Sequence, residues 1–98
     1  MRIVTLKHIQ EYSKLHPDSD TPLKVWYKKT KESEWNSFAD MKQTFNNVDS
    51  VGNNRFVFNI KGNDYRLIAI VIFASGKVYI RFIGTHKEYN KINDCSTV

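Results

Sequence analysis

The sequence predicts an α+β domain: a small, twisted, mainly antiparallel sheet with two or three helices packed on one of its faces. Three observations support this prediction. Apolar residues recur with helical spacing in the first half of the chain, the period changes to two after residue 54, and short turn sequences separate the strand-like runs. With 98 residues, 41% of them hydrophobic, the chain can build one core. We expect a single domain over residues 1–92 and a flexible tail at residues 93–98.

The N-terminal part predicts a short strand at residues 2–4, followed by a helix that Thr5 can cap. An apolar stripe with helical spacing follows, made of Leu6, Ile9, Tyr12 and Leu15. Pro17 ends this helix, because proline lacks an amide hydrogen and restricts the residue before it. The first helix therefore presents one apolar face to the rest of the domain.

Two further helices are predicted before the strands. Thr21 and Pro22 mark the start of the second helix, because Thr caps helices and proline is tolerated at the first helical position. Its apolar stripe consists of Leu23, Trp26, Tyr27 and Thr30. Ser37, with Asp40 in the capping-box position, predicts a short third helix over residues 38–45. These helices are interpreted as the scaffold of the domain.

Residues 46–54 are polar and predict a loop, with a turn signal at residues 52–54. In the strand that follows, alternate residues point toward the core, namely Phe56, Phe58 and Ile60. A tight connection comes next, in which Gly62 and Asn63 can take positive φ. Residues 65–73 are apolar on both faces, which is typical of a central strand.

The last strand is predicted to end at Gly84. Its core-facing residues are expected to be Val78, Ile80 and Phe82, and those facing away to be Tyr79, Arg81 and Ile83. A brief helical turn through Lys91 should follow. The register between this strand and the central one is not fixed by the sequence, so Arg66 and Arg81 are expected to lie on the same face only in one of two registers.

The positive charge is concentrated in the strand-rich half. Residues 54–91 carry seven Lys or Arg against Asp64 and Glu88, a net charge of +5, whereas residues 1–53 carry eight against seven, a net charge of +1. Such a distribution is typical of a face that binds a polyanion, although solubility alone also explains many small basic domains. The lone Cys95 cannot form an internal disulfide, and no apolar run approaches the roughly 20 residues of a membrane span. We therefore expect a cytoplasmic protein with no membrane contact.

The candidate reactive residues suit RNA chemistry. His86 follows the end of the last strand, and an imidazole can transfer a proton in either direction near neutral pH. Arg66 lies in an otherwise apolar run, and a guanidinium fork suits two phosphate oxygens. Tyr89 can stack on an unpaired base or donate a proton. Other candidates for contact with the RNA backbone are Lys61, Asn63, Arg81 and Lys91. The spacing of the three histidines predicts no metal site, and no cofactor is expected.

Three runs carry a family resemblance: HPDSDTPLKVWY at residues 16–27, VFNIKGNDYRLI at 57–68 and YIRFIGTHKEY at 79–89. Together they resemble the HigB-type toxins of bacterial type II toxin–antitoxin systems, within the RelE-like mRNA interferases. The resemblance implies a RelE-like fold and a metal-independent endoribonuclease that cuts mRNA in the A site of the translating ribosome. It also implies functional roles for His86 in its TH-x-EY context and for Arg66 in its YRL strand.

The resemblance further implies a partner, an antitoxin with a helix-turn-helix domain, and a toxin–antitoxin complex that binds operator DNA through the antitoxin. Two alternatives stay open on the sequence. Proteins of this fold include gyrase poisons, and a non-catalytic protein that binds RNA or the ribosome fits the same charge pattern, because a fold does not fix a function.

Overall fold

The computed structural model describes residues 1–4 and 6–98. Within them, five strands form one sheet in the order β1-β5-β4-β3-β2: β1 (Arg2–Ile3), β2 (Asp49–Gly52), β3 (Arg55–Ile60), β4 (Tyr65–Ile72) and β5 (Lys77–Thr85). The helices are α1 (Leu6–Leu15), α2 (Asp20–Glu32), α3 (Phe38–Thr44) and α4 (His86–Tyr89), with 3₁₀ turns at Pro17–Ser19 and Cys95–Thr97. Only β1 pairs in parallel, so the predicted α+β fold with a mainly antiparallel sheet is confirmed.

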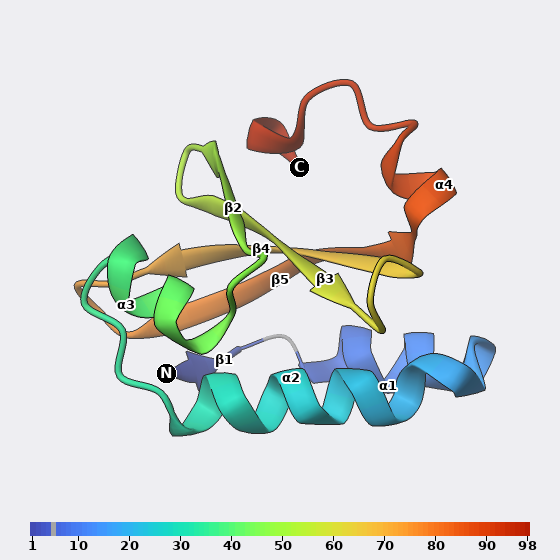
Figure 1. Ribbon diagram of the computed structural model, residues 1–98, viewed down its shortest axis with the longest axis horizontal. Coiled ribbons are helices and arrows are strands. Elements are labelled where there is room, and N and C mark those ends of the chain that lie inside the picture. The colour runs from blue at the N-terminus through green and yellow to red at the C-terminus, as the bar shows by residue number, and fades with distance from the viewer. Residues whose placement is uncertain (5) are drawn as a thin grey trace.

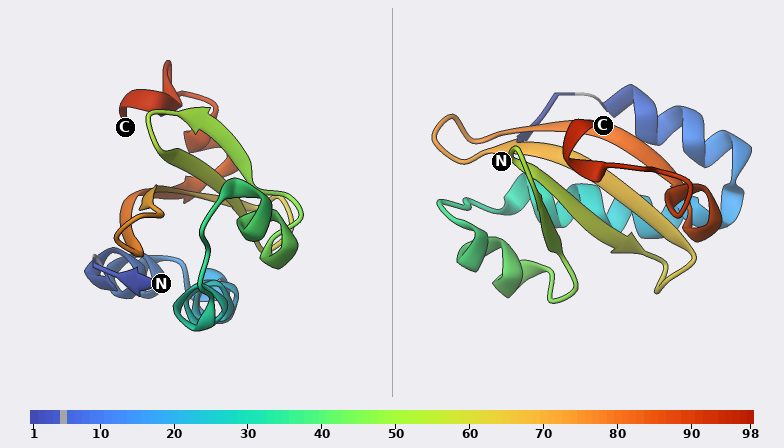
Figure 2. Two further views of the ribbon diagram at one scale, coloured as in Figure 1. Left: turned by 90° about the vertical axis from the view of Figure 1, so that its left-hand side faces the viewer. Right: turned by 90° about the horizontal axis from the view of Figure 1, so that it is seen from above.

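The helices α1 and α2 run side by side beneath one face of the sheet, and the segment after α4 lies above the other (Figure 1, Figure 2). We call the second face, which is turned away from α1 and α2, the distal face. Its side chains from β3 and β4 are Arg55, Val57, Asn59, Arg66, Ile68 and Ile70. No helix among the described residues is long and apolar enough to cross a membrane.

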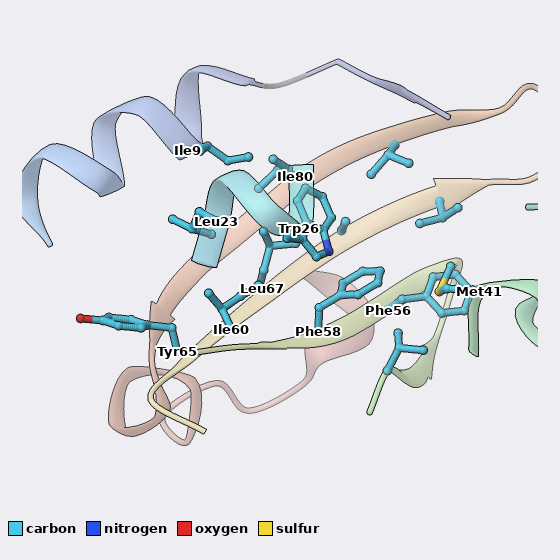
Figure 3. Close-up of a cluster of buried hydrophobic side chains, with 14 of the residues drawn as sticks. Ile9, Leu23, Trp26, Met41, Phe56, Phe58, Ile60, Tyr65, Leu67 and Ile80 are labelled. Carbon is cyan, nitrogen blue, oxygen red and sulfur yellow. The ribbon is translucent and has the colours of Figure 1, made fainter. Parts of the chain in front are cut away.

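The hydrophobic core lies between α1, α2 and the other face of the sheet. Trp26 of α2 contacts Phe58 of β3 edge to face, with ring centroids 5.4 Å apart (Figure 3). The buried cluster contains Ile9, Leu23, Trp26, Trp35, Met41, Val48, Phe56, Phe58, Ile60, Tyr65, Leu67, Ala69, Val71, Val78 and Ile80. Each large apolar side chain that is fully buried contributes about 1.5–3 kcal/mol, so this cluster is what fixes the sheet on its helices.

A β-bulge changes which residues of β5 face the core. One extra residue, Arg81, lies opposite the step from Ile68 to Ala69 in β4. Beyond it, Phe82 pairs with Ile68 on the distal face, while Ile83 packs against the core. The expectation that Phe82 faces the core and Ile83 faces away is therefore wrong, because a bulge shifts the alternation of a strand by one residue.

The prediction of a loop over residues 46–54 is wrong in its middle, where β2 pairs antiparallel with β3. Asp49, Ser50 and Gly52 are poor strand formers, so backbone pairing at the edge of the sheet, and not local preference, makes this strand. The predicted turn is confirmed, since Gly52, Asn53 and Asn54 all have positive φ.

The next turn also differs from expectation. Positive φ occurs at Lys61 and Gly62, so the prediction for Gly62 is confirmed and that for Asn63 is wrong. The strand β5 continues one residue past the expected end at Gly84, and α4 ends at Tyr89, before the expected Lys91.

Helix boundaries agree with the sequence to within about two residues. The second helix begins at Asp20, one residue before the predicted start at Thr21. Pro22 falls in its first turn, where backbone amides have no intrahelical acceptor, so the missing amide hydrogen of proline costs no hydrogen bond. The predicted cap at Ser37 is confirmed, because its side chain accepts from the Asp40 amide. The apolar stripe of α1 excludes Leu15, which is 77% exposed. The predicted cap at Thr5 lies outside the described residues.

Gly84 leaves room on the distal face for the ring of Phe82. A Cβ atom at residue 84 would lie 2.4 Å from Cζ of Phe82, too close for any real contact. We predict that Gly84→Ala lowers the free energy of unfolding by about 1 kcal/mol, because the ring must move. In thermal denaturation this corresponds to a Tm lower by about 4–8 °C.

The matched control is the same substitution in a Phe82→Ala background, where the obstructing ring is absent. There Gly84→Ala should change Tm little. An equal loss in both backgrounds would contradict this account of Gly84.

Candidate functional site

The short helix α4 is held where β4 begins and β5 ends. Thr85 caps it, because its hydroxyl accepts from the Glu88 amide at 3.1 Å while the Glu88 carboxylate accepts from the Thr85 amide at 2.9 Å. The amide of His86 donates to the carbonyl oxygen of Asp64 at 3.1 Å. These contacts fix the start of α4 against the first residues of β4, so four residues suffice to hold a defined turn.

Glu88 also connects α4 to α1. Hydrogen bonds from the backbone of Thr85 hold the pKa of the Glu88 carboxyl below its usual value, and the nearby His16 lowers it further. Burial and the negative charge of Glu88 raise the pKa of Tyr12 to about 12. The rings of Tyr12 and His16 stack with centroids 4.3 Å apart. Glu88 of α4 therefore lies within electrostatic reach of Tyr12 in α1 and of His16 just after it, more than 70 residues earlier in the chain.

Arg66 and Tyr89 form a contact across the two elements. The guanidinium carbon of Arg66 lies 5.6 Å from the centroid of the Tyr89 ring, within the range of a cation–π interaction. Burial raises the pKa of the Tyr89 phenol, and a hydrogen bond with Cys95 raises it further, while Arg66 opposes both. The phenol is therefore protonated at neutral pH. Arg66 as a whole is half-buried, and its Nη1 donates to the carbonyl oxygen of Asn63 at 3.4 Å in an exposed hydrogen bond.

His86 is exposed at the first position of α4, one turn before Tyr89. Its Nδ1 atom lies 3.0 Å from the side-chain nitrogen of Asn90. An amide nitrogen is a donor, so in this arrangement Nδ1 accepts and the proton of the neutral imidazole is on Nε2. The opposite edge of the ring is exposed to solvent, so Nε2 can contact a bound molecule.

A second pair of cations lies on the distal face. The Nε atoms of Arg55 and Arg81 contact the same acceptor, the backbone oxygen of Val98, at 3.1 and 3.3 Å. Arg81 is also the extra residue of the β-bulge. Because Arg55 and Arg66 alternate onto the same face of β3 and β4, the distal face carries all three arginines. The sequence does not fix the register between β4 and β5. In the register that the structure shows, Arg66 and Arg81 lie on the same face of the sheet.

Comparison with known proteins identifies the family of this chain. A family described as HigB_toxin, the RelE-like toxic component of a toxin–antitoxin system, matches residues 19–92. The chain belongs to the HigB toxin family. The "mRNA interferase toxin HigB" of Escherichia coli strain K12 is 30% identical over 92 residues, which cover 92% of this chain and 88% of that protein. The "mRNA interferase HigB" of Escherichia coli O6:H1 is 27% identical over 94 residues, covering 94% and 91%.

The remaining predicted site residues of this HigB family member lie in different places. Asn63 is in the turn beside Arg66, and Lys91 is exposed just after α4. Lys61 is ion-paired to Asp18 at 2.9 Å and to Asp64 at 3.6 Å. Asp18 precedes α2, so Lys61 contacts the helices and lies away from the distal face. The structure thus brings His86, Arg66 and Tyr89 to one end of the sheet, with Asn63 nearby, and separates Lys61 from them.

Three residues near this site were not assigned a role from the sequence. Asn90 follows His86 by four residues, a spacing that places two side chains on the same side of a helical turn. Glu88 follows Thr85 by three residues, which is the spacing of a capping box. These two signals are visible in the sequence. Arg55 gave no such signal beyond its charge, because the acceptor that it shares with Arg81 is brought to it only by the tertiary fold. Within the described part of the chain, no group of three or more His, Cys, Asp and Glu side chains can hold a metal ion.

The capping box predicts a pH-dependent contribution to stability. The pKa of Glu88 is lower in the folded protein than in the unfolded chain, so its charge stabilises the fold fully above the unfolded value near 4.5. This contribution is lost as the pH falls through the folded pKa. We predict that Glu88→Gln lowers the free energy of unfolding at pH 7 and has a smaller effect at pH 3, measured by urea denaturation at both pH values.

The matched control is Glu32→Gln at the end of α2, a charge change of the same size at an exposed position. An effect of Glu88→Gln that is equal at pH 7 and pH 3 would show that the negative charge is not what holds α4.

Proposed function

We propose that this HigB family member is the toxin of a type II toxin–antitoxin system and cleaves mRNA on the translating ribosome without a metal ion. Family membership and the names of its relatives support the activity. The observation that carries the proposal is the contact of Arg66 with Tyr89 at one end of the distal face, with His86 one turn before Tyr89 on the same short helix. That face lies in the half of the chain with the net positive charge.

In the proposed reaction, the 2′-oxygen of a nucleotide attacks the adjacent phosphorus and the 5′-oxygen leaves, which yields a cyclic 2′,3′-phosphate. Arg66 donates hydrogen bonds to the non-bridging phosphate oxygens and stabilises the extra negative charge of the transition state. His86 in its imidazolium form gives the Nε2 proton to the leaving 5′-oxygen and is left as the neutral imidazole. The raised pKa keeps the Tyr89 phenol protonated, so Tyr89 cannot act as the base. The proton of the 2′-hydroxyl passes to water.

Other residues of the proposal bind the RNA. Tyr89 stacks on or orients the base next to the scissile phosphate, and its ring is already held by Arg66. Arg81, Asn63 and Lys91 contact the RNA backbone. We also retain Lys61 in this set, although RNA contact would require it to leave Asp18.

The partners in this proposal are mRNA in the ribosomal A site and an antitoxin with a helix-turn-helix domain. The family description supports an antitoxin in general terms, since it names a toxin–antitoxin system. In the proposed complex, the antitoxin neutralises the toxin and carries it to operator DNA. Both partners are in the bacterial cytoplasm.

The nuclease proposal predicts a specific cellular result. Induction of the chain in bacteria should arrest growth and create new mRNA 5′ ends within translated reading frames, detected by transcriptome-wide end mapping. His86→Ala should reduce these ends by about 10²–10⁴-fold, the usual contribution of a general acid. Arg66→Lys should also reduce them strongly, because an ammonium does not reproduce the two-pronged contact of a guanidinium.

Lys28→Ala is the control, because Lys28 is exposed on α2 beneath the opposite face. It should behave like the wild type. Growth arrest without new 5′ ends would remove the nuclease activity from the proposal and direct attention to gyrase or to blockade of the ribosome. DNA-damage signalling would then separate those two.

The contact between His86 and Asn90 predicts a change in pH dependence. In Asn90→Asp a carboxylate accepts a proton from Nδ1 and stabilises the protonated imidazole. The falling limb of the pH–rate profile for cleavage should therefore move to higher pH, by up to about one unit. Asn90→Ala leaves Nδ1 to water and should lower the rate with little displacement of that limb. Identical pH profiles for all three proteins would exclude Asn90 as a positioning residue.

A further inference from the structure

We infer that Arg55 and Arg81 form a binding site for a backbone phosphate of RNA, and that residues 94–98 occupy this site until RNA displaces them. The inference rests on the proposed function and adds to it a second phosphate contact, in which Arg55 has a role. It also adds a competition between RNA and a segment of the protein itself.

The first support is the convergence of two cations on one oxygen. Arg55 and Arg81 belong to strands that are not neighbours, because β4 lies between β3 and β5. Their Nε atoms nevertheless contact the same backbone oxygen of Val98, at 3.1 and 3.3 Å. Two like charges that meet at one acceptor favour a ligand with negative charge. A phosphate offers several charged oxygens, so it can accept from both guanidinium groups at once.

The second support is that the backbone positions each arginine before any ligand binds. Arg55 follows the turn of positive-φ residues, and its Nη1 donates to the carbonyl oxygen of Asn53 at 3.1 Å. Arg81 is the extra residue of the bulge in β5, and bulges redirect side chains. Both side chains are thus aimed at the same place by local backbone features, so little ordering is needed on binding.

The third support is the way residues 94–98 cover the distal face, which Figure 2 shows from above. Asp94 caps the 3₁₀ turn, accepting from the amide and the hydroxyl of Ser96 at 3.0 and 2.6 Å. The side chain of Asn53 donates to the carbonyl oxygen of Ser96 at 3.0 Å. Cys95 reaches the phenol of Tyr89. The segment therefore contacts both Tyr89 and the arginine pair, and presents a main-chain oxygen where an RNA strand would present phosphate oxygens.

RNA that contacts Tyr89 and the arginine pair at once must displace this segment. The displacement exchanges one oxygen shared by two arginines for the several charged oxygens of a phosphate, each of which can accept a charge-assisted hydrogen bond. The covering segment also adds a negative charge, Asp94, to a face that is otherwise positive. Both features favour release of the segment when a polyanion arrives.

The first test measures RNA binding by fluorescence anisotropy with a single-stranded, 2′-O-methylated oligonucleotide. This probe cannot be cleaved, because it lacks a free 2′-hydroxyl. Arg55→Ala and Arg81→Ala should each weaken binding several-fold and reduce the slope of log K against log salt by about 0.7, the value for one phosphate contact with a single strand. Lys28→Ala changes the net charge equally and should leave both quantities close to wild type.

Circular dichroism and Tm establish that the arginine variants are folded, and Arg55→Lys should retain the salt slope that Arg55→Ala loses. Binding by Arg55→Ala that equals binding by Lys28→Ala would overturn the inference. So would a wild-type chain that does not bind the oligonucleotide.

The second test uses Cys95, the single cysteine of the chain, as a reporter of the covering segment. Alkylation by the neutral reagent iodoacetamide should be faster when the oligonucleotide is present, because displacement of residues 94–98 separates the partly buried thiol from Tyr89. Arg55→Ala should react faster than wild type without RNA, because the segment has lost one of its contacts. An unchanged or slower reaction on addition of RNA would show that RNA binds without displacing the segment, which would also overturn the inference.

Neither readout depends on cleavage, so the two proposals can fail separately. Loss of the new mRNA 5′ ends with both binding results as expected would remove the nuclease and retain the phosphate site. New 5′ ends with normal RNA binding by Arg55→Ala would retain the nuclease and remove this site.

Discussion

Burial of alternate side chains of β3 and β4 against α2 is the constraint on which the rest of the structure depends. Phe58 and Leu67 face Trp26 in the core. Because strand side chains alternate with a period of two, this burial forces their neighbours onto the distal face. A slip of one residue would bury charged groups, so the register is strongly specified. The core thereby determines where Arg55 and Arg66 point, although neither takes part in it.

The alternation is broken at one point in β5, and this break shapes the distal face. The bulge at Arg81 lets Ile83 join the core while Phe82 turns to the other side. Gly84 then leaves space for the Phe82 ring beside Arg66. One extra residue therefore has two effects, since it directs a cation toward the acceptor shared with Arg55 and places the Phe82 ring over Gly84, beside Arg66.

The candidate site is assembled from parts that differ in how they are held. Arg66 is on a central strand, which is the most rigid support that this sheet offers. His86 and Tyr89 are on a four-residue helix that depends on its capping box and on contact with α1. Residues 94–98 are fixed by a few hydrogen bonds at the surface. Arg66 is thus held more firmly than α4, and α4 more firmly than residues 94–98. This order is consistent with preorganised phosphate-binding groups under a segment that can be replaced.

The sequence by itself determined the features that depend on local pattern. Helical spacing and strand alternation predicted the α+β fold, and an arginine within an apolar strand and a histidine after the last strand marked Arg66 and His86. Only the tertiary structure decided the pairing of β2 with β3 and the bulge at Arg81. It also decided the contacts between residues far apart in sequence, such as Lys61 with Asp18, and Arg55 and Arg81 with Val98. The physical reason is that local preference is encoded within a few neighbouring residues. Strand order and long-range contacts follow from how the whole chain buries its apolar surface.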